Sequence, residues 1–386
     1  MGAQKVDVVI IGAGFVGGIL ALQLLSQGFR VCLVEKKKLK RPSLKESGGR
    51  AFALSSGVVE KLKQLSFWDG LDAYASPIKE MQLSRASGGG VLSFSPQSVG
   101  LEKVGVVLNE GYLRAHLRKK LLEKASGDRN FFLVDGDSVT EKSTGLGSVK
   151  VFLENGPTFE ARLVVNASGR HSSGQGAISW DYRQKALVFQ VGHTLPHHNV
   201  AFEHFAPDGP LAFLPLKGNL SGVVWSLDTK RAEALASQPK ILLNSLIQHF
   251  GWGLGDLTLS SEILSYPLTL YMPYAVTGHR QVFMGDAAHG IHPVAGQGLN
   301  LGLRDAFCLA RSCFDLLSVG IDIGSTLALE RYARLRGVDR WSMAGLTHLF
   351  AKGFQLSIAA PFWDGGTTFL KMLPGLQNKI MRHAMS

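Results

Sequence analysis

A carboxylate and a glycine-rich turn lie close together in the run from Gly285 to Asp305, GDAAHGIHPVAGQGLNLGLRD. Asp286 follows an apolar segment that predicts a strand, and its carboxylate can accept hydrogen bonds from the hydroxyl groups of a sugar-like chain. Further along, Gly296-Gln297-Gly298 opens a helical pattern. Because a helix N-terminus presents unpaired N–H groups and a partial positive charge, the run predicts a site for a polyol-phosphate cofactor with an electron-rich ring, such as a flavin.

A second glycine-rich run, Gly12-Ala13-Gly14-Phe15-Val16-Gly17, follows a β-branched segment from Lys5 to Ile11. A helical stretch to Gln27 comes next, and a predicted strand from Phe29 to Val34 ends at Glu35. This strand–turn–helix–strand order with a terminal acid is typical of dinucleotide-binding folds. In such folds the first glycine permits the tight turn, the second admits the pyrophosphate and the third allows helix and sheet to pack closely, while the acid accepts ribose hydroxyls.

The composition describes a globular chain and excludes several kinds of site. Of 386 residues, 45% are hydrophobic and 18% charged. The three cysteines form no CxxC spacing, so neither a disulfide framework nor a structural zinc site is expected, and a reducing cytoplasm fits. His289 and His292 have no accompanying ligands, so no metal site is predicted. The uncharged run from Val8 to Leu22 follows Asp7 and is interrupted by glycines, which favours a buried strand and helix over a signal sequence.

The formal charge of +11 needs an anionic partner or another explanation, and the basic run at residues 36–41 is interpreted by default as a solvated loop. No zinc-finger or helix-turn-helix pattern accompanies it, so nucleic-acid binding is not predicted, and an anionic membrane surface is more plausible. We therefore expect a cytoplasmic protein, with peripheral contact to the inner face of the membrane left open. Leu346, Phe350, Phe354 and Ile358 form an apolar stripe that either packs internally or docks on that surface.

The order of elements predicts two kinds of sheet. Between residues 185 and 228 four short strands are separated by Pro and Gly turns, a pattern typical of an antiparallel sheet. Helices are expected at Leu108–Ala125, 231–250 and Leu299–Leu317, and further strands at Phe131–Val139, Val149–Leu153, Phe159–Val165 and Glu262–Tyr271.

Four runs of the chain resemble flavin-dependent aromatic hydroxylases of the para-hydroxybenzoate-hydroxylase type, and more narrowly the ubiquinone-biosynthesis hydroxylases. The runs are Gly12–Gly17 with Glu35, Arg50–Leu54 (RAFAL), Phe205–Leu216 (FAPDGPLAFLPL) and Gly285–Asp305. The third run belongs to the substrate domain of that family, and it carries the narrower resemblance. The resemblance as a whole covers nearly the entire chain.

The resemblance and the element pattern together predict an α/β fold. Its parts are a Rossmann-like FAD-binding domain (1–72, 106–180 and 272–335), an inserted antiparallel β-sheet substrate domain (73–105 and 181–271) and a C-terminal helical segment (336–386). The implied cofactor contacts are Gly12, Gly14, Gly17 and Glu35 for the adenosine diphosphate half, Arg50 and Asn109 near the flavin, Asp286 for the ribityl chain, and Pro293, Gly296, Gln297, Gly298, Leu299 and Asn300 along the isoalloxazine.

The reaction that the resemblance implies begins with reduction of FAD by NAD(P)H. Molecular oxygen then forms a flavin C4a-hydroperoxide, which hydroxylates the ring of a polyprenylated phenol in ubiquinone biosynthesis. Because the cofactor performs the difficult chemistry, no catalytic acid or base is assigned. The family usually has Ala-Asp-Gly where this chain has Ala167-Ser168-Gly169, and that aspartate is associated with flavin and nicotinamide binding. The electron donor therefore stays open.

Two other functions remain compatible with the sequence. One is a different flavoprotein reaction, such as that of a polyprenyl reductase or another aromatic hydroxylase. The other is a degenerate subunit that binds FAD or lipid within an assembly of related biosynthetic enzymes, a possibility raised by Ser168.

Overall fold

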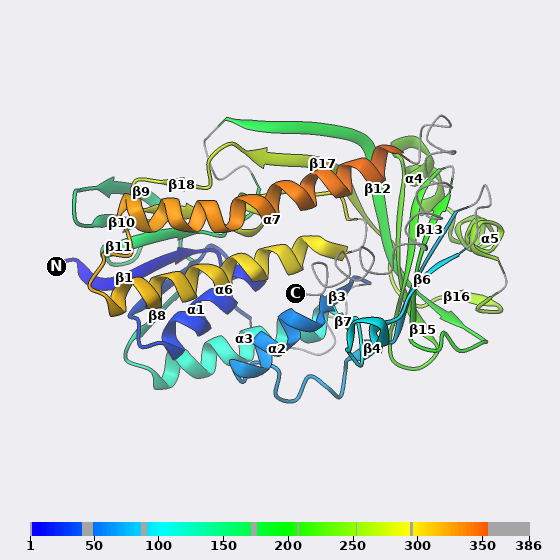
Figure 1. Cartoon of the computed structure of the whole chain (residues 1–386), viewed down its shortest axis with the longest axis horizontal. Helices are drawn as coiled ribbons and strands as arrows, with labels where there is room; N and C mark the ends of the chain where they lie inside the picture. The colour runs from blue at the N-terminus through cyan, green and yellow to red at the C-terminus, as the bar shows by residue number, and fades with distance from the viewer. Residues whose placement is uncertain are drawn as a thin grey trace.

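A computed structural model describes residues 2–40, 49–85, 91–170, 176–206, 208–251, 253–293 and 296–353. The molecule is elongated, with a helix-covered sheet at one end and a large, mainly antiparallel sheet at the other (Figure 1). Two long strands, β12 (Ala177–His193) and β17 (Leu264–Pro273), pair with each other and connect the two ends.

The first sheet is built around buried parallel strands. Its order is β18 (Thr277–Gly278), β19 (Gln281–Phe283), β11 (Phe159–Asn166), β1 (Gln4–Ile11), β2 (Val31–Glu35) and β8 (Phe131–Asp135). In addition, β10 (Val149–Leu153) pairs with β11, and β9 (Val139–Thr144) pairs with β10. β1 is parallel to both β11 and β2. Their near-continuous apolar runs are explained by burial of both faces of the sheet.

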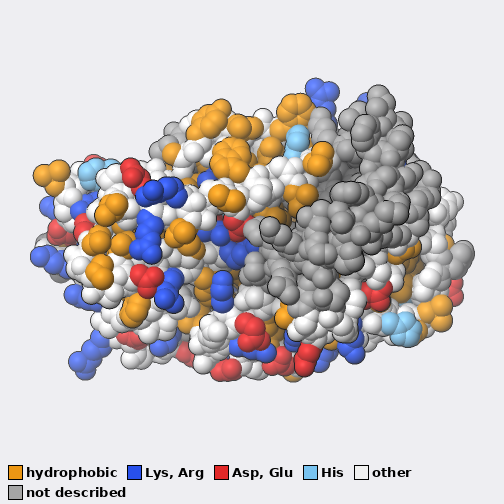
Figure 2. All heavy atoms as spheres, in the orientation of Figure 1, with side chains coloured by type: hydrophobic (Ala, Val, Ile, Leu, Met, Phe, Trp, Pro, Cys, Tyr) orange, Lys and Arg blue, Asp and Glu red, His pale blue; other side chains and the backbone are white. Residues whose placement is uncertain are grey.

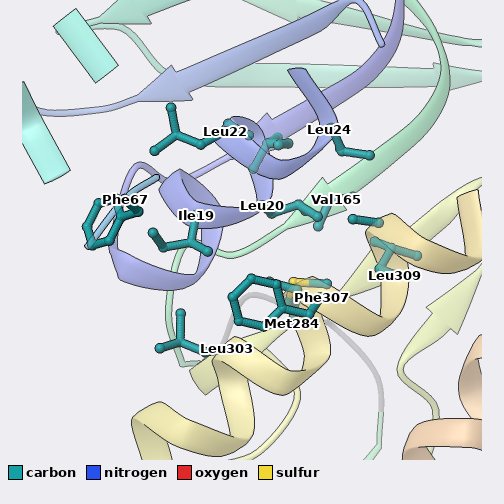
Figure 3. Packing of buried hydrophobic residues seen from close by; sticks show 14 of the residues in the cluster. Ile19, Leu20, Leu22, Leu24, Phe67, Val165, Met284, Leu303, Phe307 and Leu309 are labelled. Atoms are coloured by element: carbon teal, nitrogen blue, oxygen red, sulfur yellow. The ribbon is translucent and has the colours of Figure 1, made fainter. Parts of the chain in front are cut away.

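Helices cover this parallel sheet. They are α1 (Phe15–Ser26), α2 (Ser56–Gln64), α3 (Glu110–Gly127), α6 (Gln297–Ser318) and α7 (Thr326–Gly353). Figure 3 shows Ile19 and Leu20 of α1 in one apolar cluster with Leu303 and Phe307 of α6. A Cβ atom at Gly302 would lie 2.7 Å from the Val16 side chain, so glycine permits the close approach of α1 and α6.

The second sheet has the order β16 (Leu257–Leu259), β12, β15 (Leu220–Asp228), β14 (Gly209–Pro215), β13 (Val200–Ala206), β5 (Glu80–Arg85) and β6 (Leu92–Phe94), and β17 pairs with β12. Two helices, α4 (Thr229–Ala236) and α5 (Pro239–Phe250), contribute to a core centred on Trp225. A small third sheet joins β3 (Ala51–Ser55), β7 (Gly105–Asn109) and β4 (Ser76–Ile78), and two 3₁₀ turns complete the elements, η1 (Pro96–Val99) and η2 (Gly285–Ala287).

The predicted fold class is confirmed, and several element boundaries are corrected. The helical region predicted at 231–250 is two helices, because Pro239 occupies the first turn of α5 and cannot continue α4. The strand predicted at Phe131–Val139 divides at Gly136, whose φ of +77° turns the chain between β8 and β9. The second sheet also contains a parallel pair, β13 with β5, which the sequence pattern did not indicate.

The division into domains stays a prediction. Strands β12 and β17 run through the proposed boundaries at 180/181 and 271/272, and α7 runs through 335/336. Residues 354–386 of the proposed C-terminal segment lie outside the described residues, as do Phe354 and Ile358 of the apolar stripe. No helix of the described part of the chain combines the length and apolarity needed to span a membrane.

Replacing Trp225 by alanine is expected to destabilise the protein by about 3–5 kcal/mol, because the indole is fully buried in the core beneath α4 and α5. Urea unfolding followed by circular dichroism measures this change. Leu146→Ala, at a side chain that is 92% exposed, serves as the control and should change stability by less than about 0.5 kcal/mol. Equal effects of the two substitutions would contradict the described core.

Candidate functional site

The glycine turn (Gly12–Gly17) connects β1 to α1 in a conformation that only glycine fits. Gly12 has a φ of +104°, and a Cβ atom there would lie 2.7 Å from the Ala167 carbonyl oxygen. A Cβ atom at Gly17 would lie 2.0 Å from the Gly12 carbonyl oxygen. At Gly14, by contrast, no heavy atom of the described residues lies within 4 Å of the Cβ position. The turn is therefore packed at both ends and open in the middle.

The N-terminus of α1 faces this opening without a capping side chain among the described residues, since Gly14 itself is the N-cap. The first N–H groups of the helix are left for an external acceptor, and a pyrophosphate is the acceptor that such a turn accommodates. The open position at Gly14 and the uncapped helix fit the FAD that the sequence predicts.

Glu35 lies beside the same turn. One carboxylate oxygen accepts a hydrogen bond of 2.8 Å from the Ala13 N–H, and the other accepts one of 3.1 Å from the Lys37 N–H. These bonds fix the end of β2 against the glycine turn. The structure thus brings Glu35 next to Gly12, Gly14 and Gly17, although its contact with a ribose stays a prediction.

The GD segment (Gly285–His289) is the second part of the predicted site. Gly285 has a φ of +61°, and a Cβ atom there would lie 3.1 Å from Val16, so this segment touches the first turn of α1. Asp286 is exposed on the 3₁₀ turn η2, and no basic group of the described residues forms an ion pair with it. Its carboxylate is available for hydroxyl groups beside the glycine turn.

The start of α6 has the same open character as the start of α1. Gly296, the N-cap, is left-handed with a φ of +62°, and its N–H donates to the Pro293 carbonyl at 2.9 Å. No side chain of the described residues caps this helix. Gly298 in the first turn has no heavy atom of the described residues within 4 Å of its Cβ position. Among the described residues, this end of α6 therefore offers a helix N-terminus without a side-chain cap and open space at Gly298.

Asn300 connects α6 to the small third sheet. Its side-chain oxygen accepts from the Ser55 N–H at 2.9 Å, and its amide nitrogen donates to the Ala53 carbonyl at 2.8 Å. Ala53 is the middle residue of β3 and Ser55 is its last, so Asn300 fixes that strand against the helix. Gln297 is buried in the turn before it, and Leu299 is partly exposed. Contact of these side chains with the isoalloxazine stays a prediction.

Arg50 and Asn109 lie near each other at the start of β3, where the Glu110 N–H donates to the Arg50 carbonyl at 2.9 Å. The Arg50 guanidinium lies over the rings of Phe52 and Tyr266, at 4.7 and 5.5 Å from their centres. Asn109 pairs with Ala51 in the β3–β7 register and caps α3 by accepting from Gly111 at 2.8 Å. The structure thus collects the predicted residues into two groups, one at the glycine turn and one around β3 and the start of α6.

A buried ionic cluster supports the GD segment, and its arginine members were not among the residues predicted from the sequence. Asp305 on α6 has a fully buried side chain. One of its oxygens bonds His289 Nε2 at 2.7 Å, and the other bonds Arg336 Nε of α7 at 2.6 Å. Burial raises the pKa of the Asp305 carboxyl, but His289 and Arg336 together outweigh burial and hold that pKa below the ordinary 3.8.

Arg340, one helical turn after Arg336, reaches the same segment through the backbone. Its Nη2 donates to the Ala288 carbonyl at 2.8 Å and to the Pro273 carbonyl at 3.3 Å. The i, i+4 spacing of the two arginines was the available sequence signal, but only the fold shows that this face of α7 covers the GD segment. Helix α7 therefore positions a part of the site that lies far away in sequence.

Ser168 occupies the position where the related family usually has aspartate. Its N–H and hydroxyl both donate to the Asn166 side-chain oxygen, at 3.1 and 2.7 Å. The hydroxyl is therefore engaged at the end of β11. As for metals, the described ranges contain no group of three or more His, Cys, Asp or Glu side chains arranged to hold an ion.

The chain is similar to FAD-binding proteins and to hydroxylases of the ubiquinone type. The family model described as FAD binding domain matches residues 5–332. The chain is 33% identical to ubiquinone hydroxylase UbiL of Rhodospirillum rubrum, over 99% of this chain and 90% of that protein. It is 30% identical to 3-demethoxyubiquinol 3-hydroxylase of Escherichia coli, over 91% of this chain and 90% of that protein.

Among solved structures, PqsL of Pseudomonas aeruginosa, described as a probable FAD-dependent monooxygenase, has a TM-score of 0.77 at 21% identity. The match covers 94% of this chain and all of that one. At this identity the likeness establishes the shared fold.

Gly14→Ala and Gly17→Ala are expected to separate cofactor binding from folding. A methyl group at Gly14 enters open space, so the apoprotein should keep its melting temperature while FAD binding weakens at least about tenfold. A methyl group at Gly17 meets the Gly12 carbonyl, so both stability and FAD binding should fall. Thermal unfolding and flavin-fluorescence titration measure the two effects. Unchanged FAD affinity in Gly14→Ala would rule out this turn as the pyrophosphate site.

Asp305→Asn is expected to cost about 3–5 kcal/mol at neutral pH, because it leaves the buried Arg336 without its carboxylate. Since the folded pKa of Asp305 is below 3.8, its contribution is present above that pH and is lost as pH falls through the folded pKa. The stability difference from wild type should therefore stay constant down to about pH 4 and shrink below it.

Asp315→Asn is the matched control, since Asp315 forms an exposed pair with Arg311 on the same helix. It should cost less than about 1 kcal/mol. Denaturant unfolding across the pH range tests both variants, and a cost for Asp305→Asn as small as the control's would contradict the role of the buried cluster.

Proposed function

We propose that this chain, which belongs to the FAD binding domain family of flavin-dependent monooxygenases, hydroxylates the aromatic ring of a polyprenylated phenol in ubiquinone biosynthesis. The supporting observation is that the similarity to a ubiquinone hydroxylase covers 99% of the chain. It therefore includes the large second sheet as well as the FAD-binding elements. A shared cofactor fold alone would leave the substrate class open.

The chain's own residues divide the work of holding FAD between two helix N-termini. The glycine turn and Glu35 take the adenosine diphosphate half at α1, and Asp286 takes the ribityl chain. The open first turn of α6 directs its N–H groups and partial positive charge at the ring system. Bound FAD supplies the redox chemistry that activates molecular oxygen.

The region beside β3 is suited to exclude water. A buried apolar cluster joins β3 and β7 to the second sheet through Ala51, Val107, Ala201 and Leu216. A Cβ atom at Gly222 of β15 would lie 2.6 Å from the Ala51 Cβ atom, so the second sheet is in direct contact with β3. Keeping water out of the site protects activated oxygen from side reactions before it is transferred to the phenol.

NAD(P)H is the electron donor that we propose, in line with the family resemblance. The neutral Ser168, bonded to Asn166, supplies no charge at the position where an aspartate is usual. The prenyl tail of the substrate favours a membrane-facing entry, and Leu346 on α7 is one exposed apolar side chain (40%) that could contribute to it. Related biosynthetic enzymes remain proposed partners.

Purified holoenzyme supplied with NAD(P)H, a prenylated phenol and ¹⁸O₂ is expected to place one labelled oxygen atom on the aromatic ring. Mass spectrometry of the product measures the label, and enzyme without reductant is the control. A reduced prenyl chain with no label would indicate a reductase. Bound FAD with no substrate-dependent NAD(P)H oxidation and no label, also with dithionite-reduced enzyme, would indicate a non-catalytic subunit.

A further inference from the structure

A cavity lies between α1, α2, α6 and α7, and its lining includes none of the residues predicted to hold FAD. Its volume is about 600 Å³, within the usual range for small-molecule sites. Figure 2 shows Lys and Arg side chains gathered on the face of the molecule where α6 and α7 lie. The cavity is lined by Gln23, Ser26, Gln27, Lys61, Gln64, Leu65, Arg304, Phe307, Cys308, Arg311, Arg336 and Asp339. We refer to it as the basic pocket.

Positive charge exceeds negative charge in the lining of the basic pocket. Lys61, Arg304, Arg311 and Arg336 contribute four cationic groups, and Asp339 is the one acidic lining residue. Asp339 pairs with Arg304 at 3.4 Å and with Arg336 at 2.8 Å, and Asp305 also neutralises Arg336. Arg311 pairs with Asp315 at 2.8 Å. Lys61 is different, because no carboxylate of the described residues lies within ion-pair distance of its ammonium group.

The surroundings of Lys61 disfavour its charge. Its ammonium lies 5.7 Å from the centre of the Phe307 ring, a contact that favours the cation, but its other surroundings act against the charge. Partial burial lowers the pKa of Lys61, and the positive charges of Arg304 and Arg336 lower it further. Lys63, two positions later on α2, is paired with Glu60 at 3.1 Å. An anion in the pocket would relieve the repulsion that Lys61 experiences.

The neutral lining adds a second requirement on the ligand. Gln23 and Ser26 of α1, with its C-cap residue Gln27, form a polar wall of the pocket. The side-chain oxygen of Gln27 is buried and has no hydrogen-bond partner in the described part of the chain, so it requires a donor such as a hydroxyl group. Leu65 and Phe307 supply an apolar floor.

We propose that the basic pocket binds the phosphate ester of a small polyol, with the phosphate at Lys61 and Arg304 and the hydroxyl groups at the α1 wall. Arginine and lysine together are the usual partners of a phosphate. The ligand is either a free polyol phosphate or the phosphoglycerol headgroup of a membrane lipid. Arg336 lines the pocket and also holds Asp305, so the ligand would bind next to a side chain that supports the GD segment.

The test uses FAD-saturated holoenzyme, so that the probe does not occupy the cofactor site. Isothermal titration with glycerol 3-phosphate is expected to show one saturable site, and glycerol alone should show none. Lys61→Gln should weaken binding about tenfold, the loss expected for one charge-assisted hydrogen bond, and Lys61→Arg should restore it. Lys63→Gln removes the same charge from the same helix and should leave binding within about twofold, as for a solvent-exposed pair.

Sedimentation with vesicles distinguishes the two sources of the phosphate. Binding to phosphatidylglycerol vesicles, but not to phosphatidylcholine vesicles, that is lost in Lys61→Gln and kept in Lys63→Gln identifies the lipid headgroup. Binding of glycerol 3-phosphate without vesicle binding identifies a free ligand. Absence of saturable binding in both assays, or equal losses in Lys61→Gln and Lys63→Gln, would overturn the proposal. Unchanged flavin absorbance confirms that each variant is folded.

Discussion

The buried carboxylate of Asp305 is the interaction on which the arrangement of the FAD-binding region depends. It joins three segments: α6, where it resides, the GD segment through His289, and α7 through Arg336. Removing a carboxylate from water is costly, so the group is tolerated only because both of its oxygens are bonded to donors. The bond between Asp305 and Arg336 also fixes the position of α7 along α6. In this position Arg340 reaches the backbone of the GD segment.

Strand β3 has a comparable role on the other side of the site. It is bonded to β7 along its length and to Asn300 of α6 through Ala53 and Ser55, and it contacts the second sheet at Gly222. Displacing β3 would therefore disturb the start of α6 and the apolar cluster beneath the second sheet together. Strand β3 therefore connects the start of α6 with the second sheet, although these parts are separated in the sequence.

The sequence predicted the local parts of the site and missed those that depend on tertiary packing. The glycine turn and Glu35 were recognisable because their spacing is set by one strand–turn–helix unit. Asp305 lay inside the most informative run, yet its partner Arg336 is on another helix, and no local pattern shows which face of α7 packs there. The parallel pairing of β13 with β5 was missed for the same reason, since strand neighbours so far apart in sequence leave no periodic signal.

The central place of β1 in the parallel sheet has a consequence for protein synthesis. Its neighbour β11 ends at Asn166, the adjoining β19 ends at Phe283, and the second helix N-terminus of the site begins at Gln297. The glycine turn leaves the ribosome before these neighbours, and it lacks them until residue 297 has been made. During synthesis β1 can therefore pair with β2 early, whereas its other neighbour β11 is added only after residue 166, and the two helix N-termini come together later still.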